Sequence, residues 1–305
     1  MEAILRIYTH YFIYYDIEMT QYANEIKISA DNPKIGHVHK PNSEATLMGV
    51  NVNINSDGLR DKEYPVERGQ KYRIIFLGDS ITFGWGVEKE DTFETLLEVK
   101  LNEIKPTEVL NFGTGNYNSE QEVNLFFKKG QKYKPAHIVL FYFINDAEIT
   151  PQKSKWEFLS HSRVITFFWS RIQGLMANLS ESKSFKSYYS GLYSDDQQGW
   201  INTKKALTQM AQYSRANQIR FDVILLPELH NLNDYPLKAE HAKIITFLNE
   251  NNINGIDLVP FFSSVEDPQE LWVAADDAHP NKKAHQMIAD FSFDFITRGI
   301  KWEKN

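Results

Sequence analysis

A serine, a histidine and two aspartates stand in a pattern that suits nucleophilic catalysis. Ser80 closes a Gly-Asp-Ser tripeptide directly after an apolar run at residues 74–77, and His279 lies three positions after Asp276. A serine hydroxyl becomes a good nucleophile when an imidazole takes its proton and a carboxylate orients that imidazole. We therefore predict acyl transfer with Ser80 as nucleophile, His279 as base and Asp276 as its partner. Asp277 is the rival partner, but the Asp-x-x-His spacing favours Asp276.

The segments that must position these residues alternate between strand and helix patterns. Short runs rich in Val, Ile, Leu or Phe predict buried strands at residues 72–77, 108–112, 137–143, 221–226 and 255–259. Helical patterns fall between or after them, at residues 91–104, 119–134, 202–217, 237–251 and 281–297. This alternation predicts an α/β fold with a parallel sheet that helices cover on both faces.

Polar residues follow each predicted strand. In chain order they are Ser80, then Gly115 and Asn116, then Asn145, then Glu228 and His230, and finally Asp276 and His279. The carboxyl ends of parallel strands lie on one edge of a sheet, where open α/β folds hold their ligands. We therefore expect these residues to converge, with Glu228 and His230 as candidate substrate contacts.

Attack on an ester carbonyl creates an oxyanion, which needs preorganised hydrogen-bond donors. The backbone N–H of Ser80, a backbone N–H in the turn after the second strand and the side-chain amide of Asn145 are the candidates. In that turn Asn116 is the predicted donor and Gly115 is its rival.

Two further regions flank or interrupt this pattern. Residues 1–70 are predicted to be an N-terminal extension, and residues 71–305 the catalytic domain. The extension begins with a helix whose apolar residues are spaced three and four apart up to Ile26. We expect this face to pack on the protein itself, although a dimer seam or a membrane contact through residues 1–26 would use the same pattern. Residues 151–200 are rich in aromatic side chains and predict a helical insertion or lid.

Composition excludes several classes of protein. With 33 Lys and Arg against 40 Asp and Glu, the net charge is −7, and no basic stripe favours nucleic acid. The chain has no cysteine, which excludes a disulfide framework and a thiolate nucleophile. We expect no metal and no cofactor, because the sequence contains no metal-ligand spacing, P-loop or dinucleotide fingerprint.

These motifs resemble the sequence blocks of the SGNH (GDSL-like) hydrolases over roughly residues 70 to 298. The matching segments are residues 78–84, 111–118, 145–146 and 276–280. The resemblance implies a flavodoxin-like three-layer α/β/α sandwich with a five-stranded parallel sheet and an N-terminal extension. It also implies Ser80 as nucleophile, His279 as base, Asp276 as its partner and Asn145 as an oxyanion donor. Two positions depart from the family pattern, since Phe143 and Asn116 stand where glycine is usual.

The chain also resembles family members encoded with bacterial surface-polysaccharide machinery, through residues 55–61 and 115–118. Similar proteins often carry an N-terminal membrane anchor, and residues 2–6 resemble the segment directly after such an anchor. The chain as written has no run long enough to span a bilayer. The sequence leaves the compartment open: as written, the chain would be cytoplasmic. An anchor removed ahead of it would make it periplasmic or membrane-bound.

We therefore expect a serine esterase that hydrolyses small acyl esters, acetyl groups on a carbohydrate foremost. The first alternative is an O-acetyltransferase that uses the same triad with a sugar hydroxyl as acceptor. The second is a non-catalytic polysaccharide-binding or scaffold protein, which would have no need of Ser80, Asn145, Asp276 and His279 together.

Overall fold

A computed structural model describes residues 15–150 and 185–298 of the chain. Its centre is a five-stranded parallel sheet in the order β6-β5-β7-β8-β9. The strands are β5 (Tyr72–Gly78), β6 (Thr107–Gly113), β7 (His137–Tyr142), β8 (Arg220–Leu225) and β9 (Asn254–Asp257). This is the flavodoxin-like strand order, and it confirms the predicted α/β class.

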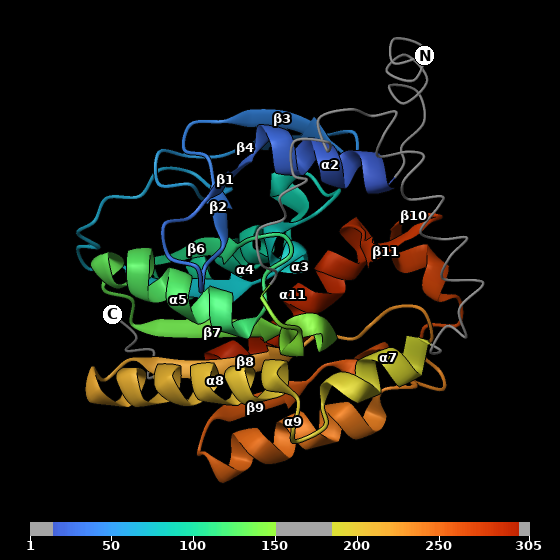
Figure 1. Cartoon of the computed structure of the whole chain (residues 1–305). Helices are drawn as coiled ribbons and strands as arrows, with labels where there is room; N and C mark the ends of the chain where they lie inside the picture. Colours follow the sequence, from blue (N-terminus) through green and yellow to red (C-terminus); the bar gives the residue numbers. More distant parts are fainter. Residues whose placement is uncertain (1–14, 151–184, 299–305) are drawn as a thin grey trace, which may run out of the picture.

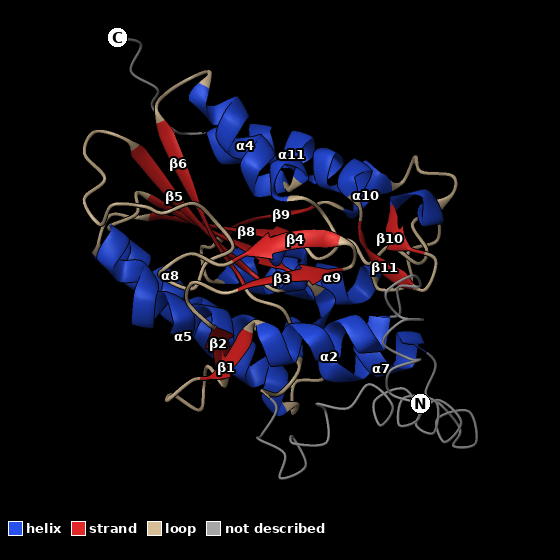
Figure 2. Ribbon diagram, turned by 90° about the horizontal axis from the view of Figure 1, so that it is seen from above, coloured by secondary structure: helices blue, strands red, loops and turns tan. Residues whose placement is uncertain are grey.

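Helices cover both faces of the sheet (Figure 2). On one face lie α4 (Phe93–Asn102) and α11 (Lys282–Thr297), which pack on Ile74 and Phe76 of β5. The other face packs against α5 (Ser119–Lys129), α8 (Gln198–Ala216) and α9 (Lys238–Glu250), and it includes Ile75 and Leu77. Successive strand residues point to opposite faces, so burial on both faces favours apolar residues along most of each central strand, as at Ile74, Ile75, Phe76 and Leu77 of β5.

The N-terminal region packs above the carboxyl ends of β5 and β6 (Figure 1). It consists of α2 (Tyr15–Glu25) and two antiparallel pairs, β1 (Lys27–Ser29) with β2 (His37–His39) and β3 (Glu44–Leu47) with β4 (Val50–Asn53). Tyr22 and Ile26 are fully buried against Phe83 and Trp85. The predicted helix is confirmed for α2, and its apolar face packs on the protein itself. The residues of that pattern before Tyr15 lie outside the described residues.

Shorter elements complete the described chain. They are α3 (Ser80–Phe83), α7 (Phe185–Leu192), α10 (Val259–Phe262), the antiparallel strands β10 (Trp272–Ala274) and β11 (Asp277–Pro280), and 3-10 turns at Lys89–Asp91, Gly130–Tyr133, Ile144–Ala147 and Pro268–Leu271. Most of the predicted aromatic insertion lies outside the described residues, and α8 already begins at Gln198. The insertion, and the division at residue 70, therefore stay predictions.

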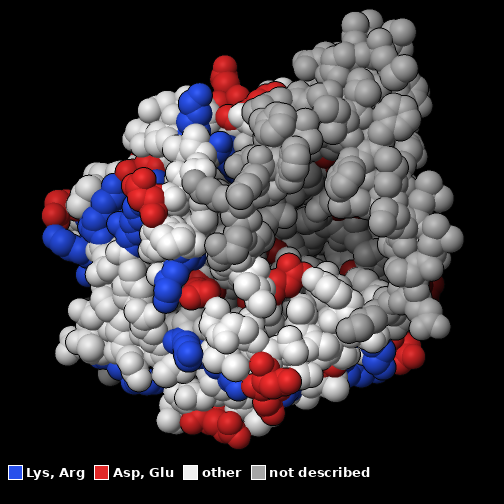
Figure 3. All heavy atoms as spheres, viewed as in Figure 1, with Lys and Arg blue, Asp and Glu red and all other residues white. Residues whose placement is uncertain are grey.

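The surface carries charges of both signs. On the face seen in Figure 3, the Lys and Arg side chains of the described residues lie among Asp and Glu side chains and form no basic band. No helix within residues 15–150 and 185–298 is long and apolar enough to cross a membrane.

Candidate active site

Ser80 lies at the carboxyl end of β5, where the strand turns directly into the short helix α3. Asp79 caps this helix, since its Oδ1 accepts a hydrogen bond of 2.8 Å from the backbone N–H of Ile81. The turn is so tight that a Cβ at Gly78 would lie 2.0 Å from Thr82 Oγ1. Glycine is therefore required before the Asp-Ser pair, and the turn presents a serine that is only 8% exposed.

The structure brings Ser80 and His279 together across 199 positions of sequence. Ser80 Oγ lies 2.8 Å from His279 Nε2, within hydrogen-bond distance. His279 stands on β11, and its other ring nitrogen, Nδ1, donates a 2.5 Å hydrogen bond to Asp277 Oδ1. The backbone N–H of His279 donates to the same oxygen over 3.1 Å. This fixed chain of contacts is the geometry that lets an imidazole remove the proton of a serine hydroxyl.

The structure places Asp277, and not the expected Asp276, in contact with His279 Nδ1. The reason is that the segment is a strand and not a single turn: β11 begins at Asp277 and pairs with β10. Residues two apart in a strand point to the same side, so the side chains of Asp277 and His279 lie next to each other. Asp276 precedes the strand. Asp276, Asp277 and His279 all line the cavity beside this contact.

Asp277 is held in its ionised form. Its Oδ2 accepts a 2.9 Å hydrogen bond from Trp85 Nε1. Burial by itself raises the pKa of Asp277, but the hydrogen bond and positive charge of His279, together with the Trp85 contact, outweigh it and lower this pKa below its ordinary value. Next to Ser80 in the sequence, burial raises the pKa of Asp79.

The candidate oxyanion donors differ in the hydrogen bonds that they already make. The N–H of Gly115 donates a 2.9 Å hydrogen bond to Tyr22 Oη, so it is already engaged by α2. Asn116 has a φ of 64°, a left-handed conformation that Asn tolerates, and its exposed side chain accepts a 2.7 Å hydrogen bond from Lys27 Nζ. Asn145 lies in the 3-10 turn after β7, and a hydrogen bond from its side chain to Asp79 partly offsets the rise that burial causes in the pKa of that carboxyl. The Asn116 N–H and the Asn145 amide thus stay the candidate donors beside the Ser80 N–H.

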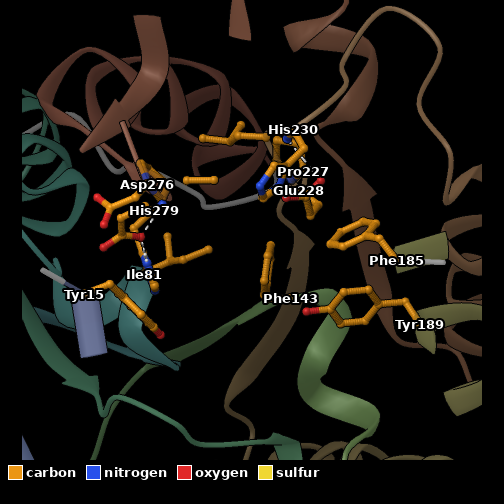
Figure 4. A pocket seen from close by; sticks show the side chains of 14 residues that line it. Tyr15, Ile81, Phe143, Phe185, Tyr189, Pro227, Glu228, His230, Asp276 and His279 are labelled. Carbon is orange, nitrogen blue, oxygen red and sulfur yellow. Dashed lines mark hydrogen bonds and ion pairs between the residues drawn. The ribbon is translucent and has the colours of Figure 1, made fainter. Parts of the chain in front are cut away.

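A cavity of about 250 Å³ opens beside His279 (Figure 4). His279, Asp276 and Tyr15 lie on one side of it, and Glu228 and His230 lie across from them. The rings of Phe143, Tyr189 and Phe185 form an aromatic wall. The structure therefore brings both predicted substrate contacts to the same cavity as the histidine.

A sequence profile of the GDSL-like lipase/acylhydrolase family matches residues 76–287. This chain belongs to that family. As a GDSL-like family member, it is a hydrolase of carboxylic esters.

Solved structures are similar to this GDSL-like hydrolase at low sequence identity. The esterase EstA from Pseudoalteromonas sp. is 17% identical, over 75% of this chain and 98% of its own, with a TM-score of 0.46. LAE5, an alpha/beta hydrolase enzyme from the metagenome of Lake Arreo, Spain, is 15% identical, over 75% and 96%, with a TM-score of 0.48. A variant of Axe2, an acetyl-xylooligosaccharide esterase from Geobacillus, is 14% identical, over 78% and 98%, with a TM-score of 0.49. No curated protein sequence matches the chain.

Sequence reasoning missed two aromatic residues at the site of this GDSL-like hydrolase. The ring of Tyr15 stacks on that of His279, with centroids 5.9 Å apart and planes inclined by 27°. The indole N–H of Trp85 supports Asp277. The helical pattern of the first segment includes Tyr15 but carries no signal of what its face would cover, and nothing in the sequence around Trp85 indicates its partner.

No group of three or more His, Asp or Glu side chains within the described residues is arranged to hold a metal ion. Buried histidines outside the site are instead paired inside the fold. His137 Nε2, for example, lies 2.9 Å from Asp222 Oδ2 between neighbouring strands.

Proposed function

We propose that this protein is a serine esterase that hydrolyses small acyl esters, acetyl groups on a carbohydrate foremost. The observation that carries the proposal is the chain of contacts from Ser80 Oγ through His279 to Asp277, at 2.8 Å and 2.5 Å. A buried serine hydroxyl within hydrogen-bond distance of an oriented imidazole has the arrangement that nucleophilic catalysis requires.

The reaction proceeds in two halves. Ser80 Oγ attacks the ester carbonyl while its proton passes to His279 Nε2, and Asp277 stabilises the imidazolium that forms. When the tetrahedral intermediate collapses, the bond from the carbonyl carbon to the alcohol oxygen breaks, and His279 gives its proton to the leaving alcohol. Water then attacks the acyl-enzyme with His279 again as base, which releases the acid and restores the Ser80 hydroxyl.

The size and lining of the cavity support the substrate class. A volume of about 250 Å³ lies below the roughly 300–1,000 Å³ of typical drug-sized ligand sites, so it suits a short acyl group. The aromatic wall of Phe143, Tyr189 and Phe185 offers ring faces on which a sugar can pack. The resemblance to proteins of surface-polysaccharide modification agrees with an acetylated carbohydrate.

Labelling with a fluorophosphonate tests whether the hydroxyl is activated. We expect the folded protein to form a covalent phosphonyl adduct that mass spectrometry maps to the peptide containing Ser80, because only an activated hydroxyl attacks the reagent readily. The heat-denatured protein is the control and should stay unlabelled. Absence of labelling in protein that circular dichroism shows to be folded, or labelling at another residue, would contradict the proposal.

Asn145→Ala tests the proposed oxyanion donor. We expect kcat for p-nitrophenyl acetate to fall by about 100- to 1,000-fold, because the side-chain amide would stabilise charge that develops only in the transition state. KM should change much less. A fall of only a few-fold, in a variant whose melting temperature is unchanged, would assign Asn145 to structural support of the turn after β7.

A further inference from the structure

Two carboxylate-x-histidine motifs line the cavity, and in each the carboxylate accepts hydrogen bonds from the ring and the backbone of the histidine. In the first, Asp277 accepts hydrogen bonds from both the Nδ1–H and the backbone N–H of His279. In the second, Glu228 does the same for His230: its Oε1 accepts from Nδ1, and its Oε2 accepts from the backbone N–H over 3.1 Å. Only the first motif is in contact with Ser80, so the second has no part in the triad.

The second motif has one imidazole nitrogen left for a ligand. Glu228 holds Nδ1, which leaves Nε2 as the ring atom available to substrate. The Glu228 side chain is only 5% exposed, whereas the His230 side chain is 53% exposed at the cavity. A buried carboxylate that orients a half-exposed imidazole is the arrangement expected of a residue that binds something from the cavity.

A chain of hydrogen bonds to other parts of the fold holds the loop that carries this pair. The backbone N–H of Glu228 donates to Tyr235 Oη over 3.1 Å. Tyr235 Oη lies 2.9 Å from His241 Nε2, and His241 Nδ1 lies 3.0 Å from Asp257 Oδ1. This chain runs from the loop after β8 to the end of β9, so the position of the imidazole is fixed by the sheet and not by a free loop.

Trp272 joins the second motif to the first. Its ring packs edge-on against His230, with centroids 4.8 Å apart, and its Nε1 donates to the carbonyl of Leu229 over 3.1 Å. Trp272 also pairs with Pro280 in the β10–β11 hairpin, next to His279. The β10–β11 hairpin therefore contacts both motifs, and the two histidines lie across the cavity from each other (Figure 4). Phe185 also packs on the His230 ring, with centroids 5.5 Å apart.

We propose that His230, oriented by Glu228, binds a hydroxyl group of the alcohol part of the ester, in a subsite for a polyhydroxylated ring. This inference rests on the proposed function and names the substrate class of the same site. His230 Nε2 exchanges a hydrogen bond with the hydroxyl, while the neighbouring aromatic rings pack on the apolar face of the sugar. The subsite would hold the leaving alcohol in hydrolysis and an acceptor alcohol in transfer alike.

Two matched esters test the subsite. Methyl 6-O-acetyl-glucopyranoside carries the acetyl group on a hydroxylated six-membered ring, and cyclohexylmethyl acetate carries it on a ring without hydroxyls. The readout is the ratio of kcat/KM for the sugar ester to kcat/KM for the carbocyclic ester. We expect the ratio to exceed one in the wild type and to fall about tenfold in His230→Ala, the discrimination that one hydrogen bond provides. His230→Gln, which keeps a hydrogen-bonding side chain, should restore part of it.

Asp234→Ala is the matched control, because Asp234 is an exposed residue of the same loop and should leave the ratio unchanged. Equal ratios in the wild type and His230→Ala would overturn the subsite, whether both rates fall together or neither falls, and would leave the proposed esterase intact. Hydrolysis of neither ester by the wild type would instead contradict the proposed function itself.

Discussion

Ser80→Ala is expected to remove nearly all hydrolysis of p-nitrophenyl acetate. Loss of the nucleophile in a serine triad lowers kcat by about 10⁶-fold, because the remaining imidazole has no hydroxyl to activate and no acyl-enzyme forms. The residual rate would come from the oxyanion donors and substrate binding alone. The measurement is kcat at saturating ester, with enzyme concentrations high enough to detect a slow residual reaction.

The same variant should remain folded. Among the described residues the Ser80 side chain is hydrogen-bonded to His279, and the cap of α3 is made by Asp79 and not by Ser80. We therefore expect a melting temperature within a few degrees of the wild type, together with loss of fluorophosphonate labelling. Full activity in Ser80→Ala would show that another group is the nucleophile.

Asp277→Asn is expected to lower kcat by up to about 10⁴-fold. The amide has no negative charge to stabilise the imidazolium of His279, and its N–H groups favour the wrong tautomer of the ring. Asp276→Asn is the matched control, since it changes the neighbouring residue in the same way and should cost only a few-fold. The comparison uses the pH profiles of kcat/KM for both variants and the wild type.

Stability should respond to pH through the same carboxylate. The pKa of Asp277 is lowered in the folded protein, so its contribution to stability is present above its unfolded-state pKa and is lost as the pH falls through the lowered value. Asp277→Asn lacks this ionisation and should lose less stability over that acidic range than the wild type does.

The kinetic comparison has its own contradicting outcome. Similar kcat values for Asp276→Asn and Asp277→Asn would contradict the assignment of Asp277.

Local pattern determined much of this fold. Residues 74–77 have the pattern of a strand because burial on both faces favours apolar side chains, and β5 spans Tyr72–Gly78. The predicted fifth strand is too long: β9 ends at Asp257, and the next residues begin α10, where Pro260 occupies the first turn. Such differences at element ends arise because helix and strand patterns overlap over one or two residues.

Motif order also determined which residues could meet. A residue that follows a parallel strand reaches the carboxyl edge whatever the order of the strands, so Ser80, Asn145, His230 and His279 could be assigned to one region from the sequence alone. The choice between Asp276 and Asp277 could not be made in that way. It depends on whether the segment before His279 is a turn or a strand, and only the pairing of β10 with β11 decides that.

No local pattern in the sequence could predict the contacts that α2 makes. Tyr22 Oη accepts a hydrogen bond from the backbone N–H of Gly115, 93 positions away, and the ring of Tyr15 stacks on that of His279. The spacing of apolar residues in a helix indicates that one face is apolar, but not which surface that face packs on. The sequence by itself indicated a serine, histidine and carboxylate pattern and the edge of the sheet where it lies. Only the tertiary structure showed which carboxylate contacts His279 and which aromatic rings surround it, because those contacts depend on strand pairing and on packing between distant segments.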